Sequence, residues 1–277
     1  MDIRYAIAPG HARTFDTAEI RDQFLVQKLF EVGEVSSVYS VEDRMLVMGV
    51  CPGRRKLSLE VGPEITGTDF LLARRELGTI NLGGPGSVTA DGKTHTVAKY
   101  EGVYVGRGVR ELVFESDSAS DPAKFYTLSG PAHATYPTTK FAFDDANHVD
   151  LGSDDECNRR TIHQYIHENG VKSCNLVMGY TTLSPGSVWN TMPCHTHLRR
   201  MEVYCYFDIP EGARVFHFMG EPTQTRHVVM NNEEAIICPV WSIHSGVGTR
   251  EYAFVWAMLG ENQRFDDMDP VTMQEIK

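Results

Sequence analysis

Two histidines and a glutamate carry the strongest chemical signal in this sequence. His195 and His197 flank a threonine, and Glu202 follows His197 by five residues. Side chains alternate faces along a β-strand, so the two histidines would project together and could hold one metal ion. Glu202 would point to the other face of an unbroken strand, so a turn or bulge over 198–201 is needed if it binds the same ion. The alternative for a histidine pair alone is a polar strand that faces solvent.

A fourth candidate ligand, His244, lies further along the chain in the run PVWSIHSGVG, five residues after Pro239. Together the two segments resemble the paired motifs of the cupin superfamily, where three His and one Glu bind a metal inside a small β-barrel. The residues that match these ligands are His195, His197, Glu202 and His244. The departures concern loop geometry: Gly186 lies nine residues before His195 rather than six, and Trp241 and Gly248 replace a glycine and an asparagine.

The resemblance is closer in the second half of the chain. The runs VKSCNLVMG, PGSVWNTMPCHTHLRRMEVYCYFD, MGEPTQTRH, WSIHSGVGT and GENQRFDDMD are similar to the 5-keto-4-deoxyuronate isomerase family, and YVGRG and PAHATYPT in the first half resemble it more weakly. The resemblance implies two cupin-like β-barrels (a bicupin), one Zn²⁺ per subunit in the second barrel, and a homo-hexamer. Ligand softness alone would equally admit Fe, Mn, Ni or Co.

The resemblance also implies a reaction, the conversion of 5-dehydro-4-deoxy-D-glucuronate to 3-deoxy-D-glycero-2,5-hexodiulosonate in pectin and uronate degradation. A proton would leave the carbon that bears the hydroxyl, an enediol would form, and the proton would return to the neighbouring carbon. A divalent ion bound to both oxygens would acidify that C–H bond. Three alternatives stay open: a cupin dioxygenase with iron or copper, the related 5-deoxyglucuronate isomerase, and a non-catalytic sugar-binding or storage cupin.

Several polar and charged residues are candidates for moving the proton and holding the substrate. Tyr180, Lys172, Glu261 and Gln263 are possible bases, and none is preferred, so the catalytic residue stays unassigned. An anionic sugar acid also needs a cation, because an arginine can hold a carboxylate through two parallel hydrogen bonds. The candidates for substrate binding are Arg199, Arg200 and Lys172, followed by Arg159 and Arg160.

Other histidines fit ordinary structural roles. His163 and His167 share a strand face beside the Asn169-Gly170 turn, where solvent or a hydrogen bond is the expected partner. His217 and His227 flank the MGEPTQT loop and could line the mouth of a barrel, but a hydrogen-bonded histidine is the simpler expectation.

The elements that must position these residues are predominantly strands. Most of the chain consists of short extended runs separated by Gly, Asn, Asp and Pro, which predicts an all-β fold with a few short helices. Asp91-Gly92 and Asn169-Gly170 predict two-residue hairpin turns, and apolar spacing predicts a helix over 16–32. The polar, proline-containing stretch 117–158 predicts a boundary between an N-terminal barrel without metal (1–150) and a C-terminal barrel with the metal site (151–277).

Composition limits the classes of partner. The 277 residues are 42% hydrophobic and 23% charged, as in globular chains, and the net charge of −11 argues against nucleic acid. No apolar run is long enough to predict a membrane span, and the first residues lack the pattern of a signal peptide. Six cysteines without a CxxC pair predict reduced thiols, so we expect a cytoplasmic protein whose partner is a small anionic sugar acid.

Overall fold

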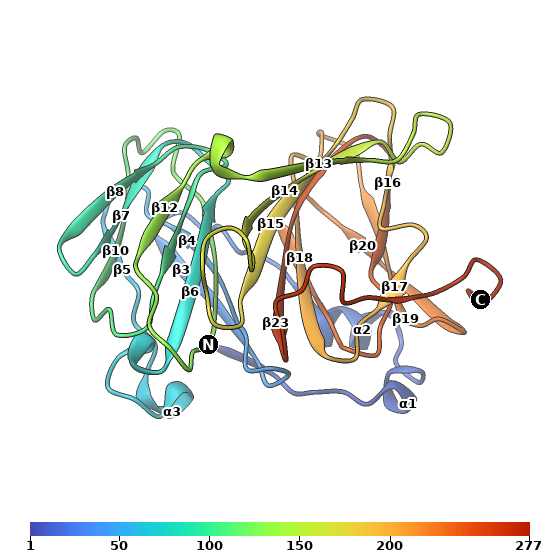
Figure 1. Cartoon of the computed structure of the whole chain (residues 1–277), viewed down its shortest axis with the longest axis horizontal. Helices are drawn as coiled ribbons and strands as arrows, with labels where there is room; N and C mark the ends of the chain where they lie inside the picture. Colours follow the sequence, from blue (N-terminus) through green and yellow to red (C-terminus); the bar gives the residue numbers. More distant parts are fainter.

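The computed structural model describes residues 1–277 and shows two β-sandwiches side by side (Figure 1). Each sandwich pairs a seven-stranded sheet with a four-stranded sheet, which confirms the predicted all-β fold of two cupin-like barrels. The helices are short: α1 (Pro9–Ala12), α2 (Thr17–Phe24), α3 (Pro63–Thr66), and the 3-10 turns η1 (Leu71–Ala73) and η2 (Phe143–Asp145).

The first sandwich is built from the N-terminal half of the chain. Its seven-stranded sheet has the order β1 (Asp2–Arg4), β3 (Glu34–Ser40), β4 (Leu46–Cys51), β11 (Phe125–Pro131), β6 (Arg75–Asn81), β9 (Gly102–Val105) and β12 (Thr139–Phe141). Its four-stranded sheet has the order β5 (Leu57–Ser58), β10 (Leu112–Ser116), β7 (Gly86–Ala90) and β8 (Lys93–Val97). All pairs are antiparallel except β1 with β3.

The second sandwich repeats this layout. Its seven-stranded sheet has the order β13 (Asn147–Leu151), β14 (Arg160–Ile166), β15 (Val177–Leu183), β23 (Ala253–Gly260), β18 (Arg200–Phe207), β21 (Glu234–Cys238) and β2 (Leu25–Val26). Its four-stranded sheet has the order β16 (Trp189–Asn190), β22 (Ser245–Gly248), β19 (Val215–Glu221) and β20 (Gln224–Met230). A small separate ladder joins β17 (His195–Thr196) to β24 (Asp269–Pro270).

The largest apolar cluster lies between the two seven-stranded sheets rather than inside either sandwich. It holds 26 buried residues, among them Tyr126 and Leu128 of β11 and Val203 and Val255 of the second sheet. Two further clusters fill the sandwiches themselves. The central strands β4, β18 and β23 are therefore covered on both faces, which explains their almost uninterrupted apolar sequences.

The N-terminal helix is shorter than the predicted 16–32. Helix α2 begins with a capping box between Asp16 and Glu19 and ends at Phe24. The helix stops there because Leu25 and Val26 form β2, which pairs with β21 of the second sandwich. Ile20 and Phe24 accordingly pack into the core of the second sandwich, not the first.

The two predicted hairpins have different outcomes. Asp91 and Gly92 have φ values of 44° and 79° and join β7 to β8, so this turn is confirmed. The Asn169-Gly170 prediction is wrong, since β14 ends at Ile166 and β15 begins only at Val177. The backbone N–H groups of residues 174–176 instead donate to Glu76 of the first sandwich, at 2.6 to 2.8 Å, and so leave the strand ladder.

The two sandwiches do not correspond to two continuous segments of the chain. Residue 150 lies within β13, every residue of which pairs with β14 in the second sandwich. Helix α2 and strand β2 also join the second sandwich, although they precede most of the first. The division into 1–150 and 151–277 therefore stays a prediction.

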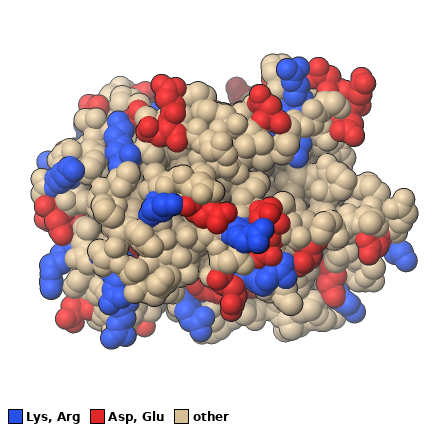
Figure 2. Space-filling model, in the orientation of Figure 1, with Lys and Arg blue, Asp and Glu red and all other residues tan.

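The surface carries charges of both signs. On the face drawn in Figure 2, Lys and Arg are interspersed with Asp and Glu, and no broad area of a single sign is visible. No helix of the structure has the length and apolar character needed to cross a membrane.

Candidate metal centre

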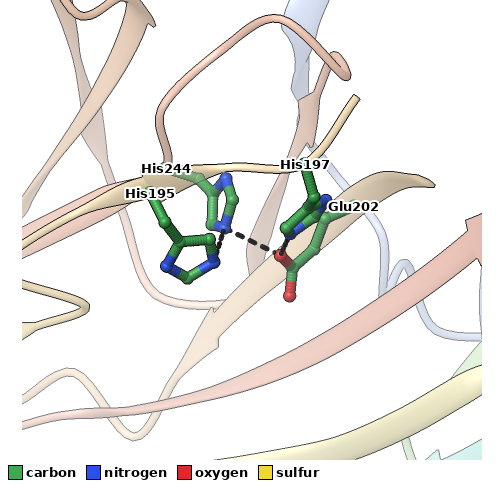
Figure 3. A group of neighbouring side chains, drawn as sticks. All are labelled: His195, His197, Glu202 and His244. Carbon is green, nitrogen blue, oxygen red and sulfur yellow. Dashed lines mark hydrogen bonds and ion pairs between the residues drawn. The ribbon is translucent and has the colours of Figure 1, made fainter. Parts of the chain in front are cut away.

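Three chain segments bring the four candidate ligands together inside the second sandwich (Figure 3). His195 lies in β17, and His197 follows just after that strand. The chain then turns at Leu198, which is 70% exposed, and Arg200 N–H closes the turn by donating to the His197 carbonyl. This confirms the turn required to bring Glu202 of β18 onto the same site. His244 immediately precedes β22.

The donor atoms of this cluster are turned toward one another. His197 Nε2 and His244 Nε2 lie 3.1 and 2.9 Å from the same Glu202 oxygen, and His244 Nε2 lies 3.0 Å from His195 Nε2. All four donor atoms lie within 4.8 Å of one another. Four ligands around a tetrahedral zinc are separated by about 3.3 Å. The spacing and the donor set of three imidazoles and one carboxylate therefore fit a divalent ion of the zinc, iron or manganese kind.

The surrounding protein prepares these groups for an ion. Burial by itself would raise the pKa of Glu202, but His244 and His197 hold it well below the usual value, so the carboxylate is ionised. Burial and then His244 lower the pKa of His195 to about 2, which leaves its imidazole neutral. Burial also opposes a proton on His197, but its contact with Glu202 outweighs this and raises the pKa. A bound metal would displace that proton.

A hydrogen bond to the backbone orients the ring of His197. Its Nδ1 lies 2.8 Å from the backbone carbonyl of Arg200 and donates to it, so Nε2 is the nitrogen that faces Glu202. A hydrogen bond of this kind at the far nitrogen sets the tautomer and orientation of a metal-binding histidine. The turn that brings Glu202 into the site thus also aligns His197.

A cavity of about 250 Å³ opens beside the cluster. His195 and Glu202 line this cavity, whereas His197 and His244 do not. The other polar lining residues are Arg160, Thr181, Thr191 and Tyr204, and the apolar ones are Leu151, Ile162, Pro193, Phe254, Trp256, Met258, Phe265 and Met268. A small organic molecule could therefore contact the cluster between largely apolar walls.

Tyr204 is the lining residue that sequence reasoning missed most plainly. It lies two residues after Glu202 on β18, so the alternation of the strand places both side chains on the same face. Its hydroxyl is 3.1 Å from the Thr191 hydroxyl. The parity of the strand was the available signal, and Trp256 and Phe254 share a face of β23 in the same way.

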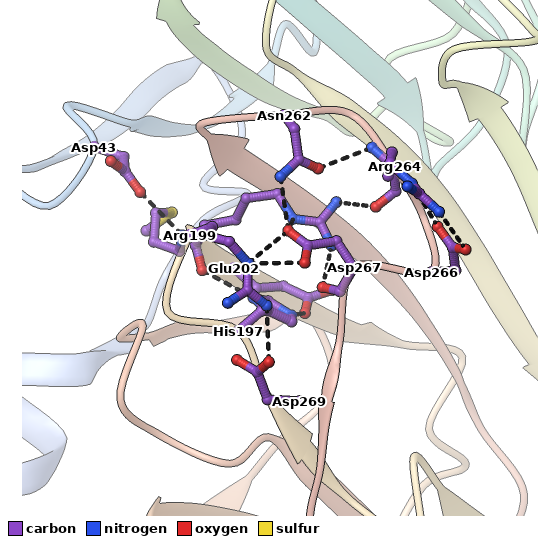
Figure 4. A network of polar contacts seen from close by, with 11 residues as sticks. Asp43, His197, Arg199, Glu202, Asn262, Arg264, Asp266, Asp267 and Asp269 are labelled. Carbon is purple, nitrogen blue, oxygen red and sulfur yellow. Dashed lines mark hydrogen bonds and ion pairs between the residues drawn. The ribbon is translucent and has the colours of Figure 1, made fainter.

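The three residues predicted to bind substrate are not among those that line the cavity. Arg199 pairs with Asp267 and Asp269 at 2.8 and 2.9 Å (Figure 4). Arg200 is fully buried and donates to the backbone carbonyls of residues 264 and 267. Lys172 donates to the Glu168 carbonyl. Both arginines thus hold the 262–269 loop, because its carboxylates pair with Arg199 and its backbone carbonyls accept hydrogen bonds from Arg200.

The candidate bases also lie elsewhere. Tyr180 is buried between the sandwiches, with its ring 4.4 Å from His163 and 5.4 Å from Tyr100. Gln263 donates to Ser173, and Glu261 borders a different hollow. None of these residues, nor Lys172, lines the cavity beside the cluster.

The histidines expected to have ordinary structural roles make hydrogen bonds or face solvent. His163 Nδ1 lies 2.8 Å from His148 Nδ1, and His217 Nδ1 lies 2.8 Å from the Tyr206 hydroxyl. His227 is exposed on β20. These placements agree with the ordinary roles expected for His163 and His217.

One hairpin of the first sandwich contacts both ligand-bearing segments. The Glu42 carboxylate accepts from Val240 N–H at 2.9 Å, four residues before His244. Asp43 accepts from Met201 N–H, also at 2.9 Å, next to Glu202 (Figure 4). No sequence pattern near residue 42 indicated this role, since the contacts cross from one sandwich to the other.

Solved structures share this architecture at low sequence identity. An IolB-like protein of Salmonella typhimurium superimposes with a TM-score of 0.68 at 13% identity, over 90% of this chain and 96% of that one. Bacillus subtilis oxalate decarboxylase gives a TM-score of 0.58 at 10% identity, over 87% of this chain and 76% of that one. The fold and the cluster of three His and one Glu define a protein of the cupin class.

Sequence comparison identifies the family within that class. The model of the KduI/IolB family matches residues 24–273, and the chain belongs to this family. The 4-deoxy-L-threo-5-hexosulose-uronate ketol-isomerase of Caldicellulosiruptor bescii is 52% identical over 277 residues, which cover 100% of both chains. The enzyme of that name from Escherichia coli is 50% identical over 279 residues, again covering 100% of both.

Proposed function

We propose that this chain is a metal-dependent ketol-isomerase that converts 4-deoxy-L-threo-5-hexosulose uronate to 3-deoxy-D-glycero-2,5-hexodiulosonate. The observation that carries the proposal is the opening of His195 and Glu202, two of the four clustered ligands, onto a largely apolar cavity. Relatives about half identical over their whole length carry the name of this activity. A metal-assisted isomerisation can use both the ligand cluster and the apolar cavity, because the ion polarises the sugar carbonyl and the apolar walls limit the access of water.

The proposed metal ligands are His195, His197, Glu202 and His244, with zinc as the ion. When bound, the ion would act as a Lewis acid toward the carbonyl and the neighbouring hydroxyl of the sugar. The Glu202 carboxylate would contribute one negative charge to the bound ion, and the three imidazoles would bind it as neutral ligands. The Arg200 carbonyl keeps His197 in the required tautomer.

The other lining residues would bind and enclose the sugar. The hydroxyls of Tyr204, Thr181 and Thr191 can hydrogen-bond to sugar oxygens. Burial raises the pKa of Tyr204 well above its usual value, so its hydroxyl keeps its proton and can donate. Phe254, Trp256 and their apolar neighbours exclude water, which protects an enediol during the transfer of the proton from carbon 2 to carbon 1.

We further propose that chemistry is confined to the unit predicted as 151–277, with 1–150 as a barrel without metal. All fourteen residues that line the cavity lie in the second unit. Zinc, a hexameric assembly, a cytoplasmic location and a role in pectin degradation complete the proposal, and they rest on the resemblance to the isomerase family.

A direct assay tests the activity. Purified protein with one equivalent of zinc is incubated with 4-deoxy-L-threo-5-hexosulose uronate, and the product is followed by NMR in ordinary and heavy water. We expect the 2,5-diketo product, deuterium at the carbon that receives the proton, and no oxygen uptake. Oxygen consumption would favour a cupin dioxygenase, and turnover of 5-deoxyglucuronate alone would favour the related isomerase. Absence of turnover of either compound would contradict the proposal.

A further inference from the structure

The cavity beside the cluster contains one cationic side chain that sequence reasoning ranked below three others. Arg160 is the first residue of β14, and Ile162 lies two residues further on the same face of the strand. Both side chains line the cavity, and Arg160 is the only Lys or Arg that does so. The sole lining carboxylate, Glu202, is directed at His197 and His244.

Arg160 differs from the other arginines near the site in lacking an anionic partner. Its Nη1 donates to the Asn158 carbonyl at 2.8 Å, and no carboxylate lies within ion-pair distance. The preceding Arg159 is 62% exposed and pairs with Asp154, while Arg199 pairs with two aspartates. A guanidinium that is partly removed from water without a counter-charge is costly to the fold, so an anion that enters the cavity would gain a ready partner.

The position of Arg160 in the sheet places it near the solvent side of the cavity. In the pairing of β13 with β14, Arg160 lies directly opposite Leu151. Leu151 also lines the cavity and is 40% exposed, so this edge meets solvent. His195 and Glu202 come from other elements, the ladder strand β17 and the strand β18. The cavity thus offers a cation from one strand and a set of metal ligands from others.

We propose that Arg160 binds the carboxylate of the sugar-acid substrate, which makes it a specificity-determining residue of the site. This inference rests on the proposed function and deepens it. In a hexosulose uronate the aldehyde and the carboxylate are at opposite ends of the six-carbon chain. Two parallel hydrogen bonds from Arg160 to the carboxylate would leave the aldehyde end for the metal ligands. Binding at both ends would fix which carbons exchange the proton.

Neighbouring arginines provide a matched test. Arg160→Gln removes the cation, Arg160→Lys keeps the charge but not the paired hydrogen bonds, and Arg159→Gln is the exposed control. We expect kcat/KM for 4-deoxy-L-threo-5-hexosulose uronate to fall about 100-fold in Arg160→Gln and about tenfold in Arg160→Lys. Arg159→Gln should stay within about threefold of the parent protein. Zinc content should be unchanged in all three, and none should have a lower unfolding midpoint than the parent protein, since Arg160→Gln removes a charge that has no carboxylate partner.

A binding measurement separates this inference from the proposed function. D-galacturonate and D-galactose differ in one carboxylate, and their affinities for the zinc-loaded protein are compared by calorimetry. We expect the parent protein and Arg159→Gln to prefer the uronate, and Arg160→Gln to lose that preference. Absence of turnover together with this pattern would overturn the proposed isomerase but support the carboxylate site. A preference that persists in Arg160→Gln, or is absent from the parent protein, would overturn the role of Arg160 whatever the turnover.

Discussion

The two sandwiches of this chain share a strand layout but differ in what lies between their sheets. In the first, the inner faces meet through apolar side chains such as Val88, Phe114 and Phe125, which have no exposed surface. In the second, part of the inner face of the seven-stranded sheet carries Glu202 and Tyr204 and borders a cavity of about 250 Å³. The one group of three or more His, Cys, Asp and Glu side chains whose spacing could hold a metal ion lies there.

The same strand layout has a supporting role in the first sandwich and carries the candidate metal ligands in the second. The first sandwich contributes no side chain to the cavity, yet Glu42 and Asp43 hold the segments that carry His244 and Glu202. Glu76 of the same sandwich accepts three backbone hydrogen bonds from the chain that leads into β15. The first sandwich, whose interior is packed with apolar side chains, thus supports the second, which contains the cavity and the candidate metal ligands.

The largest effect should come from the cluster itself. His195→Ala and Glu202→Ala each remove one of four ligands, so we expect loss of bound metal and a fall in kcat of about a thousandfold. Metal analysis and the NMR assay measure both quantities. The exposed His227→Ala variant is the control and should keep both. If the ligand variants kept full metal occupancy and activity, the proposal that the second sandwich binds the metal through these residues would be wrong.

The next effect concerns how the sandwiches are joined. Glu76→Ala would leave three backbone N–H groups and the Tyr104 hydroxyl without an acceptor in a fully buried place. We expect a loss of about 3 kcal/mol or more in the free energy of unfolding, measured with denaturant. Tyr104→Phe removes only one of these bonds and should cost about 1 kcal/mol. Equal stability of Glu76→Ala and the parent protein would show that the apolar interface alone joins the sandwiches.

A smaller effect should follow from the hairpin at residues 42 and 43. The double variant Glu42→Ala/Asp43→Ala removes the acceptors for Val240 and Met201 N–H without touching a ligand. We expect zinc affinity, measured by competition with a chelator, to fall about tenfold, because groups behind the ligands set their orientation. Glu34→Ala, on an exposed side chain of the same sandwich, should leave affinity unchanged. Unchanged zinc affinity in the double variant would show that Glu42 and Asp43 of the first sandwich do not affect the metal ligands of the second.

The smallest effect should appear at acid pH. The hydrogen bond from Arg199, followed by that from Asn262, lowers the pKa of Asp267 to about 2. A carboxylate with a depressed pKa in the folded state stabilises the fold above its unfolded pKa of about 3.9. That contribution is lost as pH falls through 2. Arg199→Gln would raise the folded pKa of Asp267, so we expect acid unfolding to begin a few tenths of a pH unit higher, as roughly follows from linkage.

The same variant tests whether Arg199 binds substrate. Arg264→Gln is the control for acid unfolding, because its partner Asp266 is 69% exposed and should contribute less. If Arg199 only anchors the loop, KM stays within about twofold of the parent value. A tenfold rise in KM would restore the substrate-binding role predicted from the sequence.

Some features of the site could be predicted because they are local. The spacing of His195, His197 and Glu202 requires a turn, and the structure has that turn at Leu198. The Asp91-Gly92 hairpin depends on two positive φ values that those residue types tolerate, and it was likewise predictable. Apolar spacing predicts helix α2 but not where it ends, because the pairing of β2 with β21 stops the helix.

The sequence by itself determined the β architecture, the four residues that converge in the second sandwich and the family. These follow from strand periodicity, ligand chemistry and motif spacing, which are properties of short segments. Only the tertiary structure decided which cations face the cavity, because that depends on what each side chain meets across sheets and loops. Arg199 and Arg200 lie between His197 and Glu202 in the sequence, but the carboxylates and carbonyls of the 262–269 loop bind them. Arg160, 35 residues before His195, lines the cavity without an anionic partner.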